Sequence, residues 1–349
     1  MIKINPLTLK KIQRFKSIKR GYYSFLLFIF ILVLAIFGEL FINNRALLVK
    51  HEGKLYFPTY GSIIPGTTFG LDYKYETNYR DLKKKYKNEN SDNFVLLPVV
   101  PYSPYENDLK EGIYPPTAPS VKDSHYLGTD KTGRDVLARL VYGFRIAIFF
   151  SLILLLCNYS IGITLGCLMG YVGGKFDLVF QRIIEIWSNI PFLYVVMIIA
   201  SIVTPSFLIL IVIMLLFGWM GMTWYLRTIT YKEKSRDYVM AARSLGASQW
   251  RIIFDHIIPN TISIIVTFIP FSISSGIVSL TALDYLGFGL LPPTPSWGEL
   301  LSQGLDRMDD ASWIVISVVS AMTIVLTMVT FIGEAIREAF DPKKYTTYE

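Results

Sequence analysis

The stretch IAIFFSLILLLCNYSIGITLGCLMGYVGG, residues 146–174, contains no charged side chain. A helix that crosses the hydrocarbon core of a bilayer needs about 20 apolar residues, so this stretch predicts a membrane-spanning helix. Further uncharged stretches occupy residues 21–38, 186–226, 257–283 and 311–333. The stretch at 186–226 is about twice as long as one crossing requires, and VTPS at 203–206 supplies a turn near its middle.

The composition points to the same class of protein. With 52% hydrophobic and 15% aromatic residues, the chain is too apolar for an ordinary soluble domain. We therefore expect an all-α membrane protein with a core at residues 145–340. Its six transmembrane helices are predicted at residues 21–43, 146–172, 181–203, 207–228, 259–283 and 311–334.

The distribution of charge predicts the orientation in the membrane. Residues 1–20 contain lysine and arginine but no acid, which places the N-terminus in the cytoplasm by the positive-inside rule. Six crossings return the C-terminal segment, 341–349, to the same side. The predicted cytoplasmic loop 229–258 is also basic, whereas the predicted outer loop 284–310 is acidic. The formal net charge of +7 is therefore largely the cytoplasmic bias of the positive-inside rule. Membrane lipid is an expected partner, and nucleic acid is not.

A long loop, residues 44–144, separates the first two predicted spans and is expected to be extracytoplasmic. Short β-like runs such as GKLYFPTY at 53–60 predict a small folded cap, whereas the polar run at 80–93 is expected to be mobile. Thr132 and Asp135 have the spacing of a capping box ahead of an apolar run. The loop is therefore predicted to end in an interfacial helix on the membrane surface. A surface helix packed on the cap is the alternative.

Two patterns inside the second predicted span indicate close packing. Gly162, Gly166 and Gly170 recur at intervals of four, which lets another helix approach the backbone closely. The pattern does not name that helix, which could belong to the same chain. Cys157 and Cys167 lie in the same span and are interpreted as packing residues, because neither a disulfide framework nor a zinc site is plausible there.

Several kinds of chemistry are not expected from this sequence. His51, His125 and His256 all lie outside the predicted spans, which excludes an intramembrane H-E-x-x-H zinc site and disfavours a serine–histidine dyad there. No catalytic residue, metal site or cofactor is predicted. The sequence has no G-x-x-x-x-G-K-[ST] phosphate loop, so a partner must hydrolyse ATP if ATP drives this protein. An ion-coupled carrier remains an alternative, although the ionisable residues lie near the span ends.

Residues 238–260, YVMAARSLGASQWRIIFDHIIPN, interrupt the apolar chain with a helix-glycine-helix pattern. Gly246 is expected to end the first helix and Ser248 to cap the second. Trp250, Ile253 and Ile257 would lie along one side of the second helix. The pair would form either a knob that inserts into a groove of another protein or an amphipathic hairpin that rests on lipid.

This segment resembles the coupling loop of bacterial ATP-binding-cassette importer permeases. It matches the E-A-A-x-x-x-G signature and the apolar-Pro pair that follows at Ala241, Ala242, Gly246, Ile258 and Pro259. Met240 stands where that signature has its glutamate, so the resemblance does not extend to a salt bridge made by that group. LGTDKTGRDVLARLVYGFRIAI at 127–148, GYVGGKFD at 170–177, DYLGFGLLPPTPSWGELLSQG at 284–304 and GEAIREAFDP at 333–342 are similar to the C-type permease of dipeptide and oligopeptide importers. The long loop is most similar to the branch that includes the microcin C permease.

The resemblance implies a type I importer permease in the bacterial inner membrane. Its partners would be a B-type permease, two cytoplasmic ATPases that hold the ATP and magnesium, and an extracytoplasmic peptide-binding protein or lipoprotein. Coupling to the ATPases would involve the five matched residues together with Trp250. An external gate or docking site is expected at Arg134, Asp135, Pro293, Trp297 and Gly298. A permease for nickel or another small solute is the alternative within the family.

Overall fold

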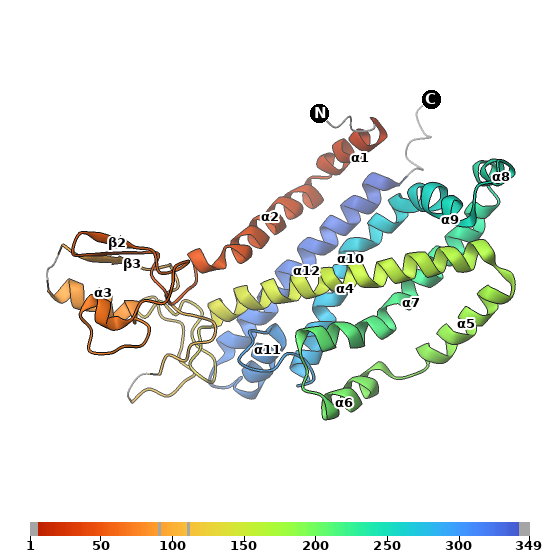
Figure 1. The fold of residues 1–349 in the computed structure, drawn as a ribbon. Helices are drawn as coiled ribbons and strands as arrows, with labels where there is room; N and C mark the ends of the chain where they lie inside the picture. Colours follow the sequence, from red (N-terminus) through yellow and green to blue (C-terminus); the bar gives the residue numbers. More distant parts are fainter. Residues whose placement is uncertain (1–5, 90–91, 110–111, 342–349) are drawn as a thin grey trace.

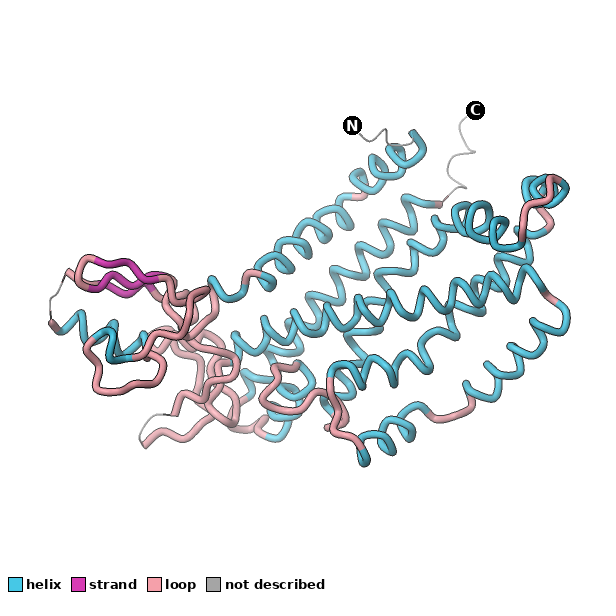
Figure 2. Tube along the Cα trace, in the orientation of Figure 1, coloured by secondary structure: helices cyan, strands magenta, loops and turns pink. Residues whose placement is uncertain are grey.

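The computed structural model describes residues 6–89, 92–109 and 112–341 and shows a mostly helical protein (Figure 1, Figure 2). The elements, in chain order, are α1 (Pro6–Ser17), α2 (Lys19–Ile36), η1 (Gly38–Leu40), β1 (Leu48–His51), β2 (Lys54–Tyr56), η2 (Gly66–Phe69), α3 (Tyr79–Asn88), β3 (Phe94–Leu96), α4 (Val136–Val172), α5 (Gly174–Ser188), α6 (Phe192–Ile202), α7 (Phe207–Lys234), α8 (Asp237–Ser244), α9 (Gln249–Arg251), η3 (Ile252–Ile257), α10 (Ile258–Tyr285), α11 (Trp297–Asp306) and α12 (Ser312–Phe340). Most of the predicted cytoplasmic tail 341–349 lies outside the described residues.

Within the described residues, five helices are long and apolar enough to cross a membrane, or six if a bent pair counts as one span. The five are α2, α4, α7, α12 and the continuous run Gln249–Tyr285, which joins α9, η3 and α10. The bent pair is α5 and α6, which meet at 70°. The turn expected at 203–206 separates α6 from α7, and the Ser206 side chain accepts a hydrogen bond from the Ile209 amide.

The span predicted at 181–203 coincides with the bent pair of α5 and α6. The helix breaks at residues 189–191, and Pro191 caps the start of α6. Proline disfavours helical backbone at the residue before it and has no N–H to donate, so Pro191 favours a break at this point. The Asn189 side chain donates to the Glu185 carbonyl at 2.6 Å and so satisfies one acceptor at the end of α5.

The separate interfacial helix predicted before the second span is not present. α4 is one helix of 37 residues that starts at Val136, and its N-cap is Asp135, which accepts a hydrogen bond from the Ala138 amide at 2.7 Å. Thr132 instead donates its hydroxyl to Asp130 at 2.8 Å. The polar face that suggested a surface helix is buried against other parts of the protein, so this turn of helix does not need a lipid interface.

The segment between α2 and α4 contains a small α/β cap, which adds strands to a fold that was expected to be all-α. Its antiparallel sheet has the strand order β2-β1-β3. α3 covers one face of this sheet and buries Tyr79, Leu82 and Tyr86 in the core of the cap. The prediction that residues 80–93 are mobile is therefore wrong for α3. Its tyrosine and leucine recur at helical spacing, while lysines such as Lys84 stay on the exposed face.

The long helices form a bundle with two distinct ends (Figure 1). α4 packs along α7 and against α10, while α12 packs against α2 and α10. α1, α8 and the end of α12 lie at one end of the bundle, which we call the α8 end. The cap and α11 lie at the opposite end, which we call the α11 end.

Candidate functional site

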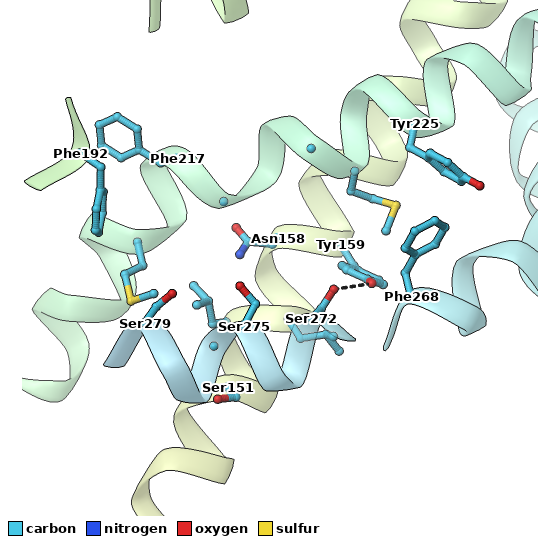
Figure 3. Close-up of a pocket in the computed structure, with 17 residues that line it drawn as sticks. Ser151, Asn158, Tyr159, Phe192, Phe217, Tyr225, Phe268, Ser272, Ser275 and Ser279 are labelled. Carbon is cyan, nitrogen blue, oxygen red and sulfur yellow. Dashed lines mark hydrogen bonds between the residues drawn. The ribbon is translucent and has the colours of Figure 1, made fainter. Parts of the chain in front are cut away.

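A cavity of about 480 Å³ opens in the middle of the bundle, where α4, α6, α7 and α10 meet (Figure 3). The Tyr159 hydroxyl from α4 and the Ser272 hydroxyl from α10 are hydrogen-bonded at 2.8 Å across it. No aspartate, glutamate, lysine, arginine or histidine lines it. The residues that line it are Ser151, Leu154, Leu155, Asn158, Tyr159, Phe192, Met214, Phe217, Gly218, Gly221, Met222, Tyr225, Phe268, Ser272, Ser275, Gly276 and Ser279.

The α8 end exposes large apolar side chains on a short helix-turn-helix segment. Leu245 is 88% exposed, and Met240 and Trp250 are each about half exposed. Gly246 has a φ of +79°, a left-handed conformation that favours glycine, and its amide donates to the Arg243 carbonyl at 3.0 Å. No atom lies within 4 Å of a Cβ placed on Gly246. The turn therefore projects away from the bundle.

The inner side of the same segment is anchored in the bundle. Ala242 is buried, whereas Ala241 is exposed. Ile252, Ile253 and Ile257 are fully buried in a cluster with residues of α4 and α7. The exposed apolar side chains of this segment are thus attached to a well-packed cluster of isoleucines. A force on the exposed side chains would therefore act on the start of α10.

Trp250, Ile253 and Ile257 were expected on one side of a second helix, and this is wrong. Trp250 is 55% exposed, whereas the two isoleucines are buried. Residues Ile252–Ile257 form a π-helix, whose wider turn changes which positions share a face. The helix then continues into α10, with Ile258 partly buried and Pro259 exposed directly after the π-helix. Ser248 caps the start of α9 through the Arg251 amide.

The α11 end contains a buried cluster of charges, which we call the ion cluster: Asp130, Arg134, Arg139 and Glu299. Arg134 donates to Asp130 at 2.7 Å and to Glu299 at 2.8 Å. Arg139 is fully buried and pairs with Glu299. It also donates to the carbonyls of Pro104 and Pro293, at 3.0 and 3.2 Å. The cluster therefore ties α4 to the cap segment and to α11.

Four of the five residues expected at an external gate or docking site are buried in this framework, and the fifth, Pro293, is exposed. Trp297 is 3% exposed, and its indole N–H donates to the Leu140 carbonyl at 2.9 Å. A side chain on Gly298 would collide with the backbone of α10. Arg134 and Asp135 are also buried. Burial of Arg134, Asp135, Trp297 and Gly298 leaves no docking surface at these four positions, whereas Pro293 stays accessible.

His125 lies beside the ion cluster between two carboxylates. Its Nδ1 is 2.7 Å from Asp135 and its Nε2 is 3.2 Å from Asp108, while Tyr102 stacks on the ring. Burial by itself lowers the pKa of His125, but the hydrogen bonds to Asp108 and Asp135 outweigh it, so the pKa is raised. The imidazole thus joins the cap segment to the N-cap of α4.

The glycine stripe of α4 faces α7. A Cβ on Gly162 would lie 2.9 Å from the Trp219 carbonyl oxygen, and a Cβ on Gly170 would lie 2.6 Å from the Arg227 carbonyl oxygen. Gly166 meets the same helix between them. The close approach is therefore internal to this chain. Cys167, next to the stripe, is buried in the cluster at the base of the α8 end.

Three features of the site were not predicted from the sequence. The serines of α10 looked like neutral positions of a span, and only the folded bundle brings them opposite Asn158. The ion cluster joins Arg139 to Glu299 across 160 positions of sequence. Asp177 in α5 binds Arg227 in α7 through two hydrogen bonds of 2.5 and 2.7 Å. For this pair the only local signal was an acid and a base near predicted span ends.

These features define a class: a multi-pass membrane protein with a neutral central cavity, a rigid charged framework at one end and an exposed apolar knob at the other. Residues 162–345 match the model of the family described as binding-protein-dependent transport system inner membrane component. The chain belongs to this family. It is a permease subunit of an ATP-binding-cassette transporter and not an enzyme, because its relatives are permease subunits whose ATPase is a separate partner.

Full-length relatives support the assignment. The chain is 37% identical to the peptidoglycan transport system permease protein YejE of Agrobacterium fabrum, over 97% of this chain and 94% of that protein. It is 38% identical to the inner membrane ABC transporter permease protein YejE of Escherichia coli K12, over 99% of both chains. It is 35% identical to the dipeptide transport system permease protein DppC of Lactococcus lactis, over 67% of this chain and 68% of that protein. A solved structure of the MetNI methionine ABC transporter in an inward-facing conformation aligns with 58% of this chain and 96% of its own, at 15% identity and a TM-score of 0.49.

Proposed function

We propose that this chain is the C-type permease subunit of a peptide importer, with the fold of a type I ABC permease. It pairs with a B-type permease, binds two cytoplasmic ATPases that hold ATP and magnesium, and receives cargo from an extracytoplasmic peptide-binding protein. The names of its relatives support peptide as the cargo, since they describe permeases of peptidoglycan and dipeptide transport systems. The neutral cavity supports transport that is not coupled to an ion gradient, because ion-coupled carriers place ionisable groups at membrane depth.

The observation that carries this proposal is the knob formed by α8, Gly246 and α9. Leu245 and Trp250 expose apolar surface that a groove on an ATPase could bury. Closure of the ATPase dimer on ATP would move the knob, and the buried isoleucines of η3 would pass the movement to α10. α10 lines the cavity, so ATP binding would change access to the cavity from the two sides of the membrane.

The same assignment orients the protein. The basic helix α1 and the knob lie at one end of the bundle, and the positive-inside rule places that end in the cytoplasm of a bacterial cell. Both termini are then cytoplasmic, and the cap and α11 lie outside the inner membrane. Labelling of a cysteine at Ser296→Cys by an impermeant reagent from the cytoplasmic side alone would overturn this orientation. Because Ser296 is buried, Thr68→Cys, on the exposed rim of the cap, serves as a second position.

Substitution of Gly246 tests the coupling role. Gly246→Val introduces a β-branched residue at a φ of +79°, at a cost of about 1 kcal/mol or more of backbone strain that reshapes the turn. We expect loss of peptide-stimulated ATP hydrolysis and of uptake by the assembled importer. Gly287→Val is the matched control, because Gly287 has the same φ and equally open surroundings but lies near the end of α10 opposite the knob. Unchanged hydrolysis and uptake in Gly246→Val would refute the coupling assignment.

A further inference from the structure

The central cavity holds an arrangement of polar groups that the family assignment does not explain. Ser272, Ser275 and Ser279 of α10 follow the three- and four-residue spacing that places side chains on one face of a helix. Asn158 of α4 lies opposite them, and its side-chain oxygen is buried without a hydrogen-bond partner in the structure (Figure 3). Gly218 of α7 makes room for this amide, because a Cβ there would collide with it.

Aromatic pairs close the two ends of this polar strip. Phe192 and Phe217 lie at one end with ring centroids 5.3 Å apart, and Tyr225 and Phe268 lie at the other with centroids 4.5 Å apart (Figure 3). Between them the walls offer hydroxyl and amide groups, which both donate and accept hydrogen bonds. The cavity volume of about 480 Å³ is in the range of small-ligand sites.

We infer that this strip is a binding site for the backbone of an extended, peptide-like chain, and that it reads amide groups and not side-chain charge. The inference rests on the proposed function and names the part of the path that holds the cargo. From Ser272 to Ser279 the helix rises about 10 Å, at 1.5 Å per residue. About three residues of extended chain have this length.

A helix of the partner permease is a poorer occupant of the strip. The backbone N–H and C=O groups of a transmembrane helix are already paired within the helix, so they cannot satisfy the Asn158 oxygen. An extended peptide presents free N–H and C=O groups along its whole length. The absence of ionisable side chains from the cavity lining removes any preference for cargo of one charge. The site therefore binds many sequences, while the neutral hydroxyls still hold the chain in place.

Charge placed at Ser275 tests this inference by changing selectivity. Ser275 is exposed to the cavity, so Ser275→Asp and Ser275→Lys each introduce a charge next to the cargo. The measurement is uptake of radiolabelled Ala-Glu-Ala and Ala-Lys-Ala by the full importer, reconstituted with its binding protein and ATPases. We expect the ratio of the two uptake rates to shift about tenfold, in opposite directions for the two variants, as attraction or repulsion at close range predicts.

The controls separate this inference from the proposed function. Ser201→Asp and Ser201→Lys place the same charges at an exposed serine near the end of α6, outside the cavity lining, and leave the ratio unchanged. Equal uptake ratios in wild type and both Ser275 variants would overturn the inference while peptide import stands. Failure of the wild-type complex to import either peptide would refute the proposed function and remove the basis of the inference.

A second pair of variants tests the inference without adding charge, so that it stays testable where the charged variants fail to assemble. Asn158→Leu removes the amide at similar volume, whereas Asn158→Ser keeps a polar group. We expect Asn158→Leu to lower the maximal uptake rate of tri-alanine about tenfold, with Asn158→Ser between it and wild type. The half-saturating concentration, which the binding protein sets, should not change. Equal rates for the two variants would overturn the inference, as would cross-linking of Ser275→Cys to the partner permease at every stage of the cycle.

Discussion

At the α11 end, arginines and carboxylates are buried together and joined to the cap, whereas at the α8 end Leu245 and Trp250 are exposed to solvent. The buried charges form ion pairs with one another within the chain, and these pairs join α4 to α11. The exposed apolar groups gain nothing from the chain itself and would be stabilised by burial against another protein. The α11 end is therefore a structural framework, whereas the α8 end presents a surface for a partner protein.

The largest expected effect on stability comes from breaking the ion cluster. Arg139→Ala removes the fully buried partner of Glu299, which keeps its ion pair with Arg134. The loss should destabilise the fold by about 3 kcal/mol, the lower end for a broken buried ion pair. Arg145→Ala is the control, because Arg145 pairs with Glu39 at 2.7 Å but is a quarter exposed, and its loss should cost at most about 1 kcal/mol. Thermal unfolding of the purified importer measures both. Similar losses for the two variants would show that the α11 end is not a special framework.

A smaller loss is expected between the two ends, where α4 packs on α7. Gly166→Leu would place a Cβ 2.5 Å from the Thr223 carbonyl oxygen, and such overpacking costs about 1–3 kcal/mol. Gly221→Ala on α7 is the control, because a Cβ there meets no atom within 4 Å. The thermal unfolding midpoint should fall for Gly166→Leu alone. A normal midpoint would mean that the helices separate without cost.

The contribution of His125 should depend on pH. Its pKa is raised in the folded protein, so the stabilisation is fully present below the unfolded pKa of about 6.5 and is lost as pH rises through the folded value. The groups that face the ring are Asp108, Asp135 and Tyr102. Unfolding midpoints measured from about pH 6 to about pH 9 should fall with pH in wild type, and the fall should be smaller in His125→Gln. Parallel profiles would contradict this role.

The smallest effect on stability is expected at the α8 end. Leu245→Asp changes a side chain that is 88% exposed, so the free energy of unfolding should stay within about 0.5 kcal/mol of wild type. Copurification of the ATPases should nevertheless be lost. Leu286→Asp, at an exposed leucine near the other end of α10, should retain the ATPases. Normal ATPase binding by Leu245→Asp would move the partner surface away from the knob.

The sequence predicted the elements that depend on local pattern. Uncharged length located the spans, and Gly246 with Ser248 marked the turn between α8 and α9. The sequence did not predict features that depend on contacts between distant residues or on small changes in helix geometry. The bend at Pro191 was missed because the uncharged stretch 186–226 runs across it without interruption. The π-helix after Arg251 has no simple periodic signal. The partners of Arg139 could not be predicted, because the fold alone brings Glu299 beside it.

The pairing of Arg139 with Glu299 also has a consequence for synthesis of the chain. The two residues are 160 positions apart, and bacterial and other ribosomes add about 5–20 residues per second. The arginine therefore waits roughly 8–30 seconds for its carboxylate. During that interval Arg139 has beside it the partners that precede it in the chain, the Asp130 carboxylate and the Pro104 carbonyl. The start of α4 therefore reaches its final set of contacts only after α11 has been synthesised.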